Sequence, residues 1–454
     1  MSQRATRRAV SVGVAASVAF VALGAVGAGA QTAASRRPAL SGSGKTIVVT
    51  SFVNGGSAKG QQEWHQYLQS QFHKMTGANV TFDSWTSTSQ ELQTLEQAAV
   101  TNSGPDIFNI GSSFTPTAWS TGVFQPLTAA QWKAVGGKQR FYLRSLTMSG
   151  PSANQQFAVP ITTGSFEMLY NKALFAKAGI KAPPTTWNQF IADATKITNP
   201  KAGIYGTAID PQDPYDPWHT YWLLTQQMGQ QFISPNLKSA EVNTPKVAKA
   251  VEFYFDFLEK FHIVNPNSLT WKGTDSFSAF ANGKVGMLLM QNLGDYKQLQ
   301  SVPFKWGFAN NPSIPYGATK LPPGGKPADS YVIGQYYGIA KYSPNKALDL
   351  KFVQLYTSTA AQLQMQRLTG NQPVNVVAGA AVANKQPVYR FFIRGEEASY
   401  PTPFTGAWGD FEVAIATATA NIASAAAGGK YSPALVQQEL AKANSVFQAH
   451  LAAG

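Results

Sequence analysis

Residues 158–197 constrain the fold more than any other stretch, because signals for strands and helices alternate within them. Val-Pro-Ile at 159–161 predicts a strand, and Thr-Thr-Gly follows at 162–164. Small residues of this kind can absorb a change in backbone dihedral angles, as hinges do. Residues 166–170 predict a second, mostly apolar strand. We therefore expect the chain to leave one lobe and enter another at 162–164.

Two helices are predicted to follow this second strand. Residues 171–178 form the first, and Gly179 ends it as a left-handed cap. Thr186 and Gln189 have the spacing of a capping box, which predicts a second helix over 187–198. Strands that alternate with helices predict an α/β fold.

The composition excludes several classes of protein. A chain of 454 residues is too long for one ordinary core, so two lobes are expected. The absence of cysteine excludes thiol nucleophiles, thiolate metal sites and disulfides. The net charge of +13 comes from scattered Lys and Arg without a basic helix, so we expect no nucleic acid partner. The five histidines are isolated and no cofactor motif appears, so we predict neither a metal site nor a cofactor.

The N-terminus has the plan of a secretory signal. Residues 1–30 carry Arg4, Arg7 and Arg8, then an apolar run, and end in Ala-Gly-Ala. The adjacent arginines permit twin-arginine export, while the general secretory route stays open. Residues 31–44 are rich in Ala, Ser, Arg and Gly and predict a flexible leader.

Four groups of residues along the chain are similar to one known family. They are VP with LYNKALFAKAGI and PPTTWNQF (159–190), GPDI with GVFQPL (104–127), FANGKVGMLLMQNLG (280–294), and SPNK with TGNQPVN (343–375). In this order they resemble the extracellular solute-binding proteins of ABC importers, family 1, of the maltose- and oligosaccharide-binding type.

The resemblance implies a two-lobed periplasmic-binding-protein fold of type II, the Venus-flytrap fold, with hinge crossings. The N-terminal lobe would consist of residues 45–160 and 336–374. The C-terminal lobe would consist of residues 161–335 and 375–454. The crossings would then lie near 159–163, 335–340 and 372–376.

The candidate ligand contacts of the first lobe lie in loops that follow strands. In open α/β sheets, ligands bind beside the carboxyl ends of strands, which favours Asn54 and Ser87. The resemblance adds Ser112 and Ser113, since the family's equivalent loop supplies polar contacts. A plain helix cap at either serine is the alternative. Thr163, in the predicted hinge between the lobes, is a separate candidate.

Residues 210–222 interleave aromatic rings with carboxylates and prolines. A pyranose lays its C–H face on a flat ring and gives its hydroxyls to Asp or Asn. The prolines keep the segment irregular, so we expect that the rings are not all core residues. Tyr215, Asp216 and Trp218 are therefore candidates, with packing as the alternative for both rings.

Four further candidates are expected in the cleft. Asn292 follows the predicted strand 285–290, where the resemblance places cleft residues. Trp408 stands where the family carries a cleft aromatic residue, and core packing is its alternative. Tyr331 begins a strand predicted to return to the first lobe, and Asp410 follows Trp408 closely.

The resemblance implies a binding function and not an enzyme. The expected ligand is a sugar or oligosaccharide, and the expected partners are the membrane permease subunits of an ABC importer. A monomer is expected, secreted to the extracellular face of the membrane or to the periplasm.

Besides a cell-surface adhesion module, two alternatives remain open. One is a secreted carbohydrate-active hydrolase that uses Asp213, Asp216 or Asp410 in the cleft, because such enzymes need two carboxylates across it. The other is a binding protein for another solute, such as a glycerol phosphodiester or a polyamine. Neither the sugar nor its chain length follows from the sequence.

Overall fold

The computed structural model describes residues 42–52, 58–214 and 216–453, and Leu40–Gly454 form one compact unit. The predicted signal, residues 1–30, and most of the predicted leader, residues 31–44, lie outside the described residues. Within the described part of the chain, no helix is both long enough and apolar enough to cross a bilayer.

The first sheet has five strands in the order β2-β1-β3-β8-β4. These strands are β1 (Thr46–Phe52), β2 (Asn79–Trp85), β3 (Ile107–Gly111), β4 (Ala158–Pro160) and β8 (Gln335–Ile339). β1 pairs in parallel with β2 and β3, whereas β8 runs antiparallel to β3 and β4. Since β8 comes from far along the chain, the sheet joins distant segments.

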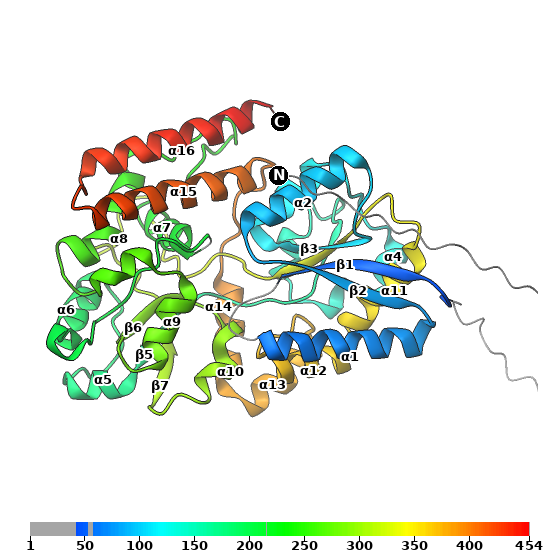
Figure 1. Cartoon of the computed structure of the whole chain (residues 1–454), viewed down its shortest axis with the longest axis horizontal. Helices are drawn as coiled ribbons and strands as arrows, with labels where there is room; N and C mark the ends of the chain where they lie inside the picture. The colour runs from blue at the N-terminus through cyan, green and yellow to red at the C-terminus, as the bar shows by residue number, and fades with distance from the viewer. Residues whose placement is uncertain (1–41, 53–57, 215, 454) are drawn as a thin grey trace, which may run out of the picture. The chain divides into compact units, whose positions relative to one another are not determined.

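Helices cover both faces of this sheet, and side chains of β3 show why. Successive residues of a strand point to opposite faces. Ile107 packs in one core with Trp64 of α1, while Phe108 packs in another with Leu95 of α2. Figure 1 shows α1 and α2 on opposite sides of the strands. The helices of this region are α1 (Ala58–Thr76), α2 (Thr88–Thr101), α3 (Thr115–Ser120), α4 (Ala129–Ala134), α11 (Lys346–Tyr356) and α12 (Thr359–Thr369).

The second sheet has three antiparallel strands in the order β6-β5-β7. They are β5 (Glu167–Asn171), β6 (Met287–Gln291) and β7 (Trp306–Ala309). The helices nearby in the sequence are α5 (Lys172–Lys177), α6 (Trp187–Ile197), α7 (Asp216–Gln227), α8 (Pro245–Glu259), α9 (Gly273–Ala281) and α10 (Tyr296–Leu299). Trp187 of α6, Trp222 of α7 and Phe255 of α8 are buried in one large core.

Four helices complete the chain, namely α13 (Val376–Lys385), α14 (Pro387–Ala398), α15 (Trp408–Ala427) and α16 (Pro433–Ala453). α15 and α16 pack along each other, α16 contacts α8, and α15 contacts both α7 and α2 (Figure 1). α15 therefore joins the helices beside the second sheet to a helix of the first.

The structure confirms the α/β fold and the local predictions around residues 158–197. The expected strands are β4 and β5, and the expected helices are α5 and α6. Thr186 and Gln189 form the capping box at the start of α6, with each side chain accepting a backbone N–H.

Candidate functional site

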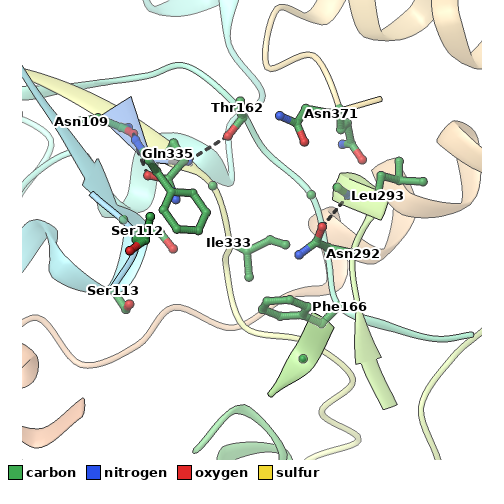
Figure 2. A pocket seen from close by; sticks show the side chains of 18 of the residues that line it. Asn109, Ser112, Ser113, Thr162, Phe166, Asn292, Leu293, Ile333, Gln335 and Asn371 are labelled. Atoms are coloured by element: carbon green, nitrogen blue, oxygen red, sulfur yellow. Dashed lines mark hydrogen bonds between the residues drawn. The ribbon is translucent and has the colours of Figure 1, made fainter. Parts of the chain in front are cut away.

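A cavity of about 730 Å³ is lined by residues at the strand ends of both sheets. This volume lies within the range of pockets that hold small molecules. Figure 2 shows its side chains, which come from segments far apart in the sequence. The strand residues in its wall include Phe52, Trp85, Asn109, Gly111, Met290, Gln291 and Gln335.

Three connecting segments meet in the wall of this cavity, at residues 161–164, 333–335 and 371–372. The backbone N–H of Ile161 donates to the carbonyl of Gln335 at 2.8 Å. The N–H of Gln335 in turn donates to the hydroxyl of Thr162 at 3.0 Å (Figure 2). The predicted hinge segments thus lie side by side, and they pass directly beside the cavity.

Gly334 makes this close approach of two segments sterically possible. Its φ of 151° lies in a region that L side chains rarely adopt, and a Cβ atom there would come within 2.4 Å of the carbonyl oxygen of Thr162. Its own carbonyl accepts from the N–H of Ser112 at 2.9 Å. Gly334 therefore ties the crossing to the predicted ligand loop.

Asn109 organises the part of the wall that belongs to the first sheet. Its side-chain oxygen accepts from the N–H of Phe52 at 2.7 Å, and its amide donates to the side chain of Gln335 at 3.1 Å. Asn109 is buried, so these bonds satisfy groups that would otherwise be costly to bury. The side chain fixes β1 and the crossing strand β8 relative to β3.

Ser112 and Ser113 follow β3 and begin a short 3₁₀ helix, Ser112–Phe114. Both line the cavity, and both are less than 10% exposed. Ser113 also hydrogen-bonds to the carboxyl of Glu412. Neither serine caps this short helix through its side chain, since its N-cap is Gly111.

Two buried carboxyls, Glu91 of α2 and Glu412 of α15, share the wall beside these serines. Glu91 accepts from the N–H of Gly111 at 2.8 Å, and Glu412 accepts from the indole N–H of Trp408 at 2.9 Å. Burial raises the pKa of Glu412 to about 8. Burial, and then repulsion by Glu412, holds the pKa of Glu91 well above its usual range. Near neutral pH Glu412 therefore keeps its proton and can donate as well as accept hydrogen bonds.

On the side of the second sheet, Asn292 follows β6 and lines the cavity. Its side-chain oxygen accepts from the N–H of Gly294 at 2.6 Å, which orients the amide (Figure 2). Asp213 also lines the cavity and accepts from the N–H of Gly273 at 3.0 Å. Lys272 adds a charged group nearby.

Aromatic rings enter the wall from both sides. Phe52 and Trp85, at the ends of β1 and β2, have ring centroids 4.8 Å apart. The ring centroids of Phe166 and Tyr331 are 5.4 Å apart. The hydroxyl of Tyr331 is 2.8 Å from His219 Nε2. Polar groups and flat rings thus converge on one space.

The family-model comparison finds a match to bacterial extracellular solute-binding proteins over residues 55–363, which is more than half of the chain. The chain belongs to this family. In this solute-binding protein, the cavity lies where segments far apart in the sequence come together.

Curated relatives are identical to this solute-binding protein at about a quarter of the aligned positions. The diacetylchitobiose binding protein DasA of Streptomyces coelicolor is 25% identical over 339 residues, which are 73% of each chain. A protein of Brucella abortus (strain 2308), named only as a binding protein, is 25% identical over 228 residues. That match covers 50% of this chain and spans about half, 54%, of the Brucella protein.

Solved structures of solute-binding proteins share the fold. A solute-binding protein of an ABC transporter from Thermotoga lettingae, bound with α-D-tagatose, has a TM-score of 0.74 at 19% identity and matches 89% of this chain and all of its own. MalE3 of T. maritima bound to maltose has a TM-score of 0.73 at 18% identity and matches 88% of this chain and 99% of its own. The two-lobed periplasmic-binding-protein fold is therefore confirmed.

Trp218 and Trp408, both expected in the cleft of this solute-binding protein, are core residues. Their side chains are 1% and 0% exposed, and neither lines the cavity. α7 begins at Asp216, so Trp218 occupies a helical position that faces the core, where its ring lies 5.0 Å from Tyr331. Trp408 binds Glu412, so it holds a residue of the wall without reaching the cavity itself.

Asp410 also lies away from the cavity of the solute-binding protein. Its carboxylate is 3.2 Å from Nδ1 of His450 on α16. Asp410 and Glu412 are two residues apart on α15, so their side chains point in different directions. Asp410 and Asp213 therefore do not share the cavity wall.

Of the remaining sequence candidates, six lie together in the wall, namely Ser87, Ser112, Ser113, Thr163, Asn292 and Tyr331. Ser87 is also the N-cap of α2, since its hydroxyl accepts from the N–H of Gln90 at 3.2 Å. Asn54, Tyr215 and the side chain of Asp216 lie outside the described residues.

The sequence analysis missed several wall residues of this solute-binding protein. Trp85 and Asn109 had a usable signal, because the first ends a strand and the second is a polar residue inside an apolar strand. Glu91 interrupts the apolar stripe of α2, which was a weaker signal. Glu412 had none, since its meeting with Glu91 depends on tertiary packing. Among the described residues, no group of three or more potential metal ligands is present.

Proposed function

We propose that this protein is the secreted substrate-binding component of an ABC importer. It binds a sugar or oligosaccharide in the cavity and delivers it unchanged to a membrane permease. It acts as a monomer at the extracellular face of the membrane or in the periplasm. The names of the relatives, with diacetylchitobiose, maltose and tagatose among the ligands, support a saccharide.

One observation carries this proposal, which is the convergence of flat rings and hydrogen-bonding side chains from both sheets on one cavity. Phe52 and Trp85 offer apolar faces on the side of the first sheet, and Phe166 offers one near the second. Asn109 and Asn292 place amides on the two sides. A pyranose has an apolar C–H face and a rim of hydroxyls, so it matches this combination.

The uncharged character of most lining groups favours a neutral ligand. Amide side chains recur in the wall, at Gln61, Asn109, Asn292, Asn371 and Gln372. Glu412 keeps its proton near neutral pH because burial raises its pKa to about 8, and burial also raises the pKa of Glu91. A polyamine would need ionised carboxylates, and a phosphodiester would need more cationic groups than Lys272 in this wall.

We place the lobes at residues 45–160 with 336–374 and at residues 161–335 with 375–454. The composition of the sheets supports this division, since β1 to β4 and β8 form one sheet and β5 to β7 the other. Closure of the lobes about the crossings would surround the sugar. The permease would then recognise the closed form.

The binding function is not expected to include hydrolysis. A retaining or inverting glycosidase holds two carboxyls on opposite sides of the scissile bond. Here Asp410 pairs with His450 away from the cavity. Glu91 and Glu412 lie together on one wall, and Asp213 on the other side is held by the N–H of Gly273. These placements support transfer of an unchanged ligand.

A thermal-shift panel tests the proposal. The protein is heated with tagatose, maltose, diacetylchitobiose, spermidine or glycerophosphocholine, and each mixture is analysed for products. A sugar at 100 times its dissociation constant should stabilise the protein by about 2.7 kcal/mol without turnover. Stabilisation by spermidine or glycerophosphocholine alone, or release of hydrolysis products, would overturn the proposal.

A further inference from the structure

A second depression in the protein surface lies between α1 and β2, outside the cavity. Its volume is about 420 Å³, and we call it the α1/β2 groove. α1 packs directly on β2, which is the edge strand of the five-stranded sheet (Figure 1). The groove therefore lies at the rim of the sheet.

The side chains that α1 contributes to the groove are mostly uncharged amides. Four glutamines line it, at positions 61, 62, 66 and 69, and these repeat at the spacing of one helix face. The charged residues Lys59 and Glu63 of α1 do not line the groove. They pair with each other instead, with Lys59 Nζ 3.9 Å from Glu63 Oε1. Amides both donate and accept hydrogen bonds, as hydroxyl groups of a sugar require.

An aromatic stack adds an apolar surface to these amides. The ring of His65 lies on Phe82 with centroids 3.9 Å apart and planes 9° from parallel. Both residues line the groove, as does Ser84 of β2. Burial lowers the pKa of His65 to about 4, so this ring is neutral at neutral pH. The groove thus pairs uncharged polar groups with aromatic carbon, as the cavity does.

Two residues connect the groove to the cavity. Gln61 and His65 belong to the linings of both. Nε2 of His65 is 2.9 Å from the hydroxyl of Ser51, which lines the cavity, and the amide of Gln61 lies 3.1 Å from the same nitrogen. This junction is the place where a chain-like ligand that leaves the cavity would meet the groove.

We infer that the α1/β2 groove is an extension subsite for a neutral oligosaccharide whose first units occupy the cavity. This inference rests on the proposed sugar-binding function and extends it to chain length. Sugars that fill the cavity alone do not reach the groove, whereas longer ones contact Gln62, Gln66 and Ser84. The protein therefore favours longer oligosaccharides over disaccharides of the same kind.

Titration calorimetry with two series of sugars tests this inference. The probes are maltose to maltoheptaose and diacetylchitobiose to hexa-N-acetylchitohexaose. In the series that binds, we expect affinity to rise about fivefold or more from the shortest to the longer members, as one or two additional uncharged hydrogen bonds would give. The double variant Gln62→Ala/Gln66→Ala should lose this rise while it keeps the affinity for the shortest member.

Two further variants sharpen the test. Gln93→Ala/Gln97→Ala is the matched control, because it removes two exposed glutamines at the same spacing from α2, where neither lines the groove. It should bind every sugar as the native protein does. Ser84→Leu fills the groove from β2 with a side chain that offers no flat ring, and it should weaken the binding of long members only.

The outcomes separate the two ideas. Equal affinity for short and long members, or a rise that survives in Gln62→Ala/Gln66→Ala and in Ser84→Leu, would overturn the extension subsite and leave the sugar-binding function intact. If no member of either series binds, both the extension subsite and the binding of these two classes of saccharide are contradicted.

Discussion

At the scale of single residues, the cavity depends on side chains that hold one another in place. Asn109 joins two neighbouring strands of the first sheet, and Trp408 holds Glu412 from within the core. Phe52, Trp85 and Phe166 are among the rings that line the cavity, whereas the conspicuous tryptophans at 218 and 408 are core residues. Aromatic content alone therefore does not locate the site.

The first prediction concerns Trp85. Trp85→Ala removes a ring from the cavity wall and should weaken sugar binding about tenfold, the order expected for loss of one aromatic contact. Trp85→Phe keeps a flat ring and should bind nearly as well as the native protein. Titration calorimetry measures both, and circular dichroism checks that each variant is folded. Full affinity in a folded Trp85→Ala protein would remove this ring from the site.

The second prediction concerns Glu412. Its pKa of about 8 lies above the usual value for glutamate, so folding leaves it protonated where the unfolded chain would ionise. This difference lowers stability as pH rises through the window from about 4.5 to 8. Glu412→Gln removes the proton linkage and should raise stability at pH 8 by roughly 1–3 kcal/mol relative to the native protein. Near pH 4 the two should be nearly equal.

Urea unfolding at several pH values measures this difference. A constant gap between Glu412→Gln and the native protein from pH 4 to pH 8 would show that Glu412 does not titrate as described.

At the scale of elements, local signals predicted secondary structure well where capping decides it. The capping box of Thr186 with Gln189 identified α6 within one residue of its end. It was harder to predict which side chains of a helix face the core. The prolines of 210–222 suggested an irregular segment, but α7 begins at Asp216, and Trp218 faces the core. Glu91 and Glu412 meet only because α2 contacts α15, and no local pattern encodes that contact.

A third prediction belongs to the crossing elements. Gly334→Ala places a Cβ atom 2.4 Å from the carbonyl oxygen of Thr162 and forces an unfavourable φ. We expect a loss of roughly 2 kcal/mol or more in unfolding free energy, together with weaker ligand binding. Gly428→Ala is the matched control, since its φ is −86° and its added Cβ would make ordinary contacts. Equal unfolding midpoints in urea for the two variants would contradict the steric role of Gly334.

At the scale of the whole molecule, buried carboxyls recur throughout the described residues. Burial is the main cause that raises the pKa values of Glu396 to about 8, Asp210 to about 7, and Asp329 and Asp349 to about 6. Each is protonated in the folded protein at a pH where the unfolded chain would be ionised. Their shared effect is a loss of stability as pH rises from about 4.5 toward 8.

Two buried histidines act in the opposite direction at low pH. Burial lowers the pKa of His65 to about 4 and that of His219 to about 3. In the unfolded chain, histidine has a pKa of about 6.5, so these residues bind protons below that pH. In the folded protein they stay neutral, and stability therefore falls as pH decreases below about 6.5. Because the raised carboxyls outnumber the two histidines, the combined effect is a stability that falls from about pH 5 toward 8, while the histidines reduce the gain at lower pH.

Scanning calorimetry across pH 4 to 9 tests this fourth prediction. The melting temperature should be highest in the mildly acidic range and should fall toward pH 9. A melting temperature that rises steadily from pH 5 to pH 8 would contradict the protonation of these carboxyls in the folded state.

The central claim is that a saccharide binds in the cavity and is held from both sheets. A crystal structure of the protein with the tightest-binding sugar tests this most directly. We predict a sugar ring against Trp85, Phe52 or Phe166, with hydrogen bonds to Asn109 or Ser112 on one side and to Asn292 on the other. A sugar bound outside this cavity, or held by residues of one sheet alone, would contradict the claim.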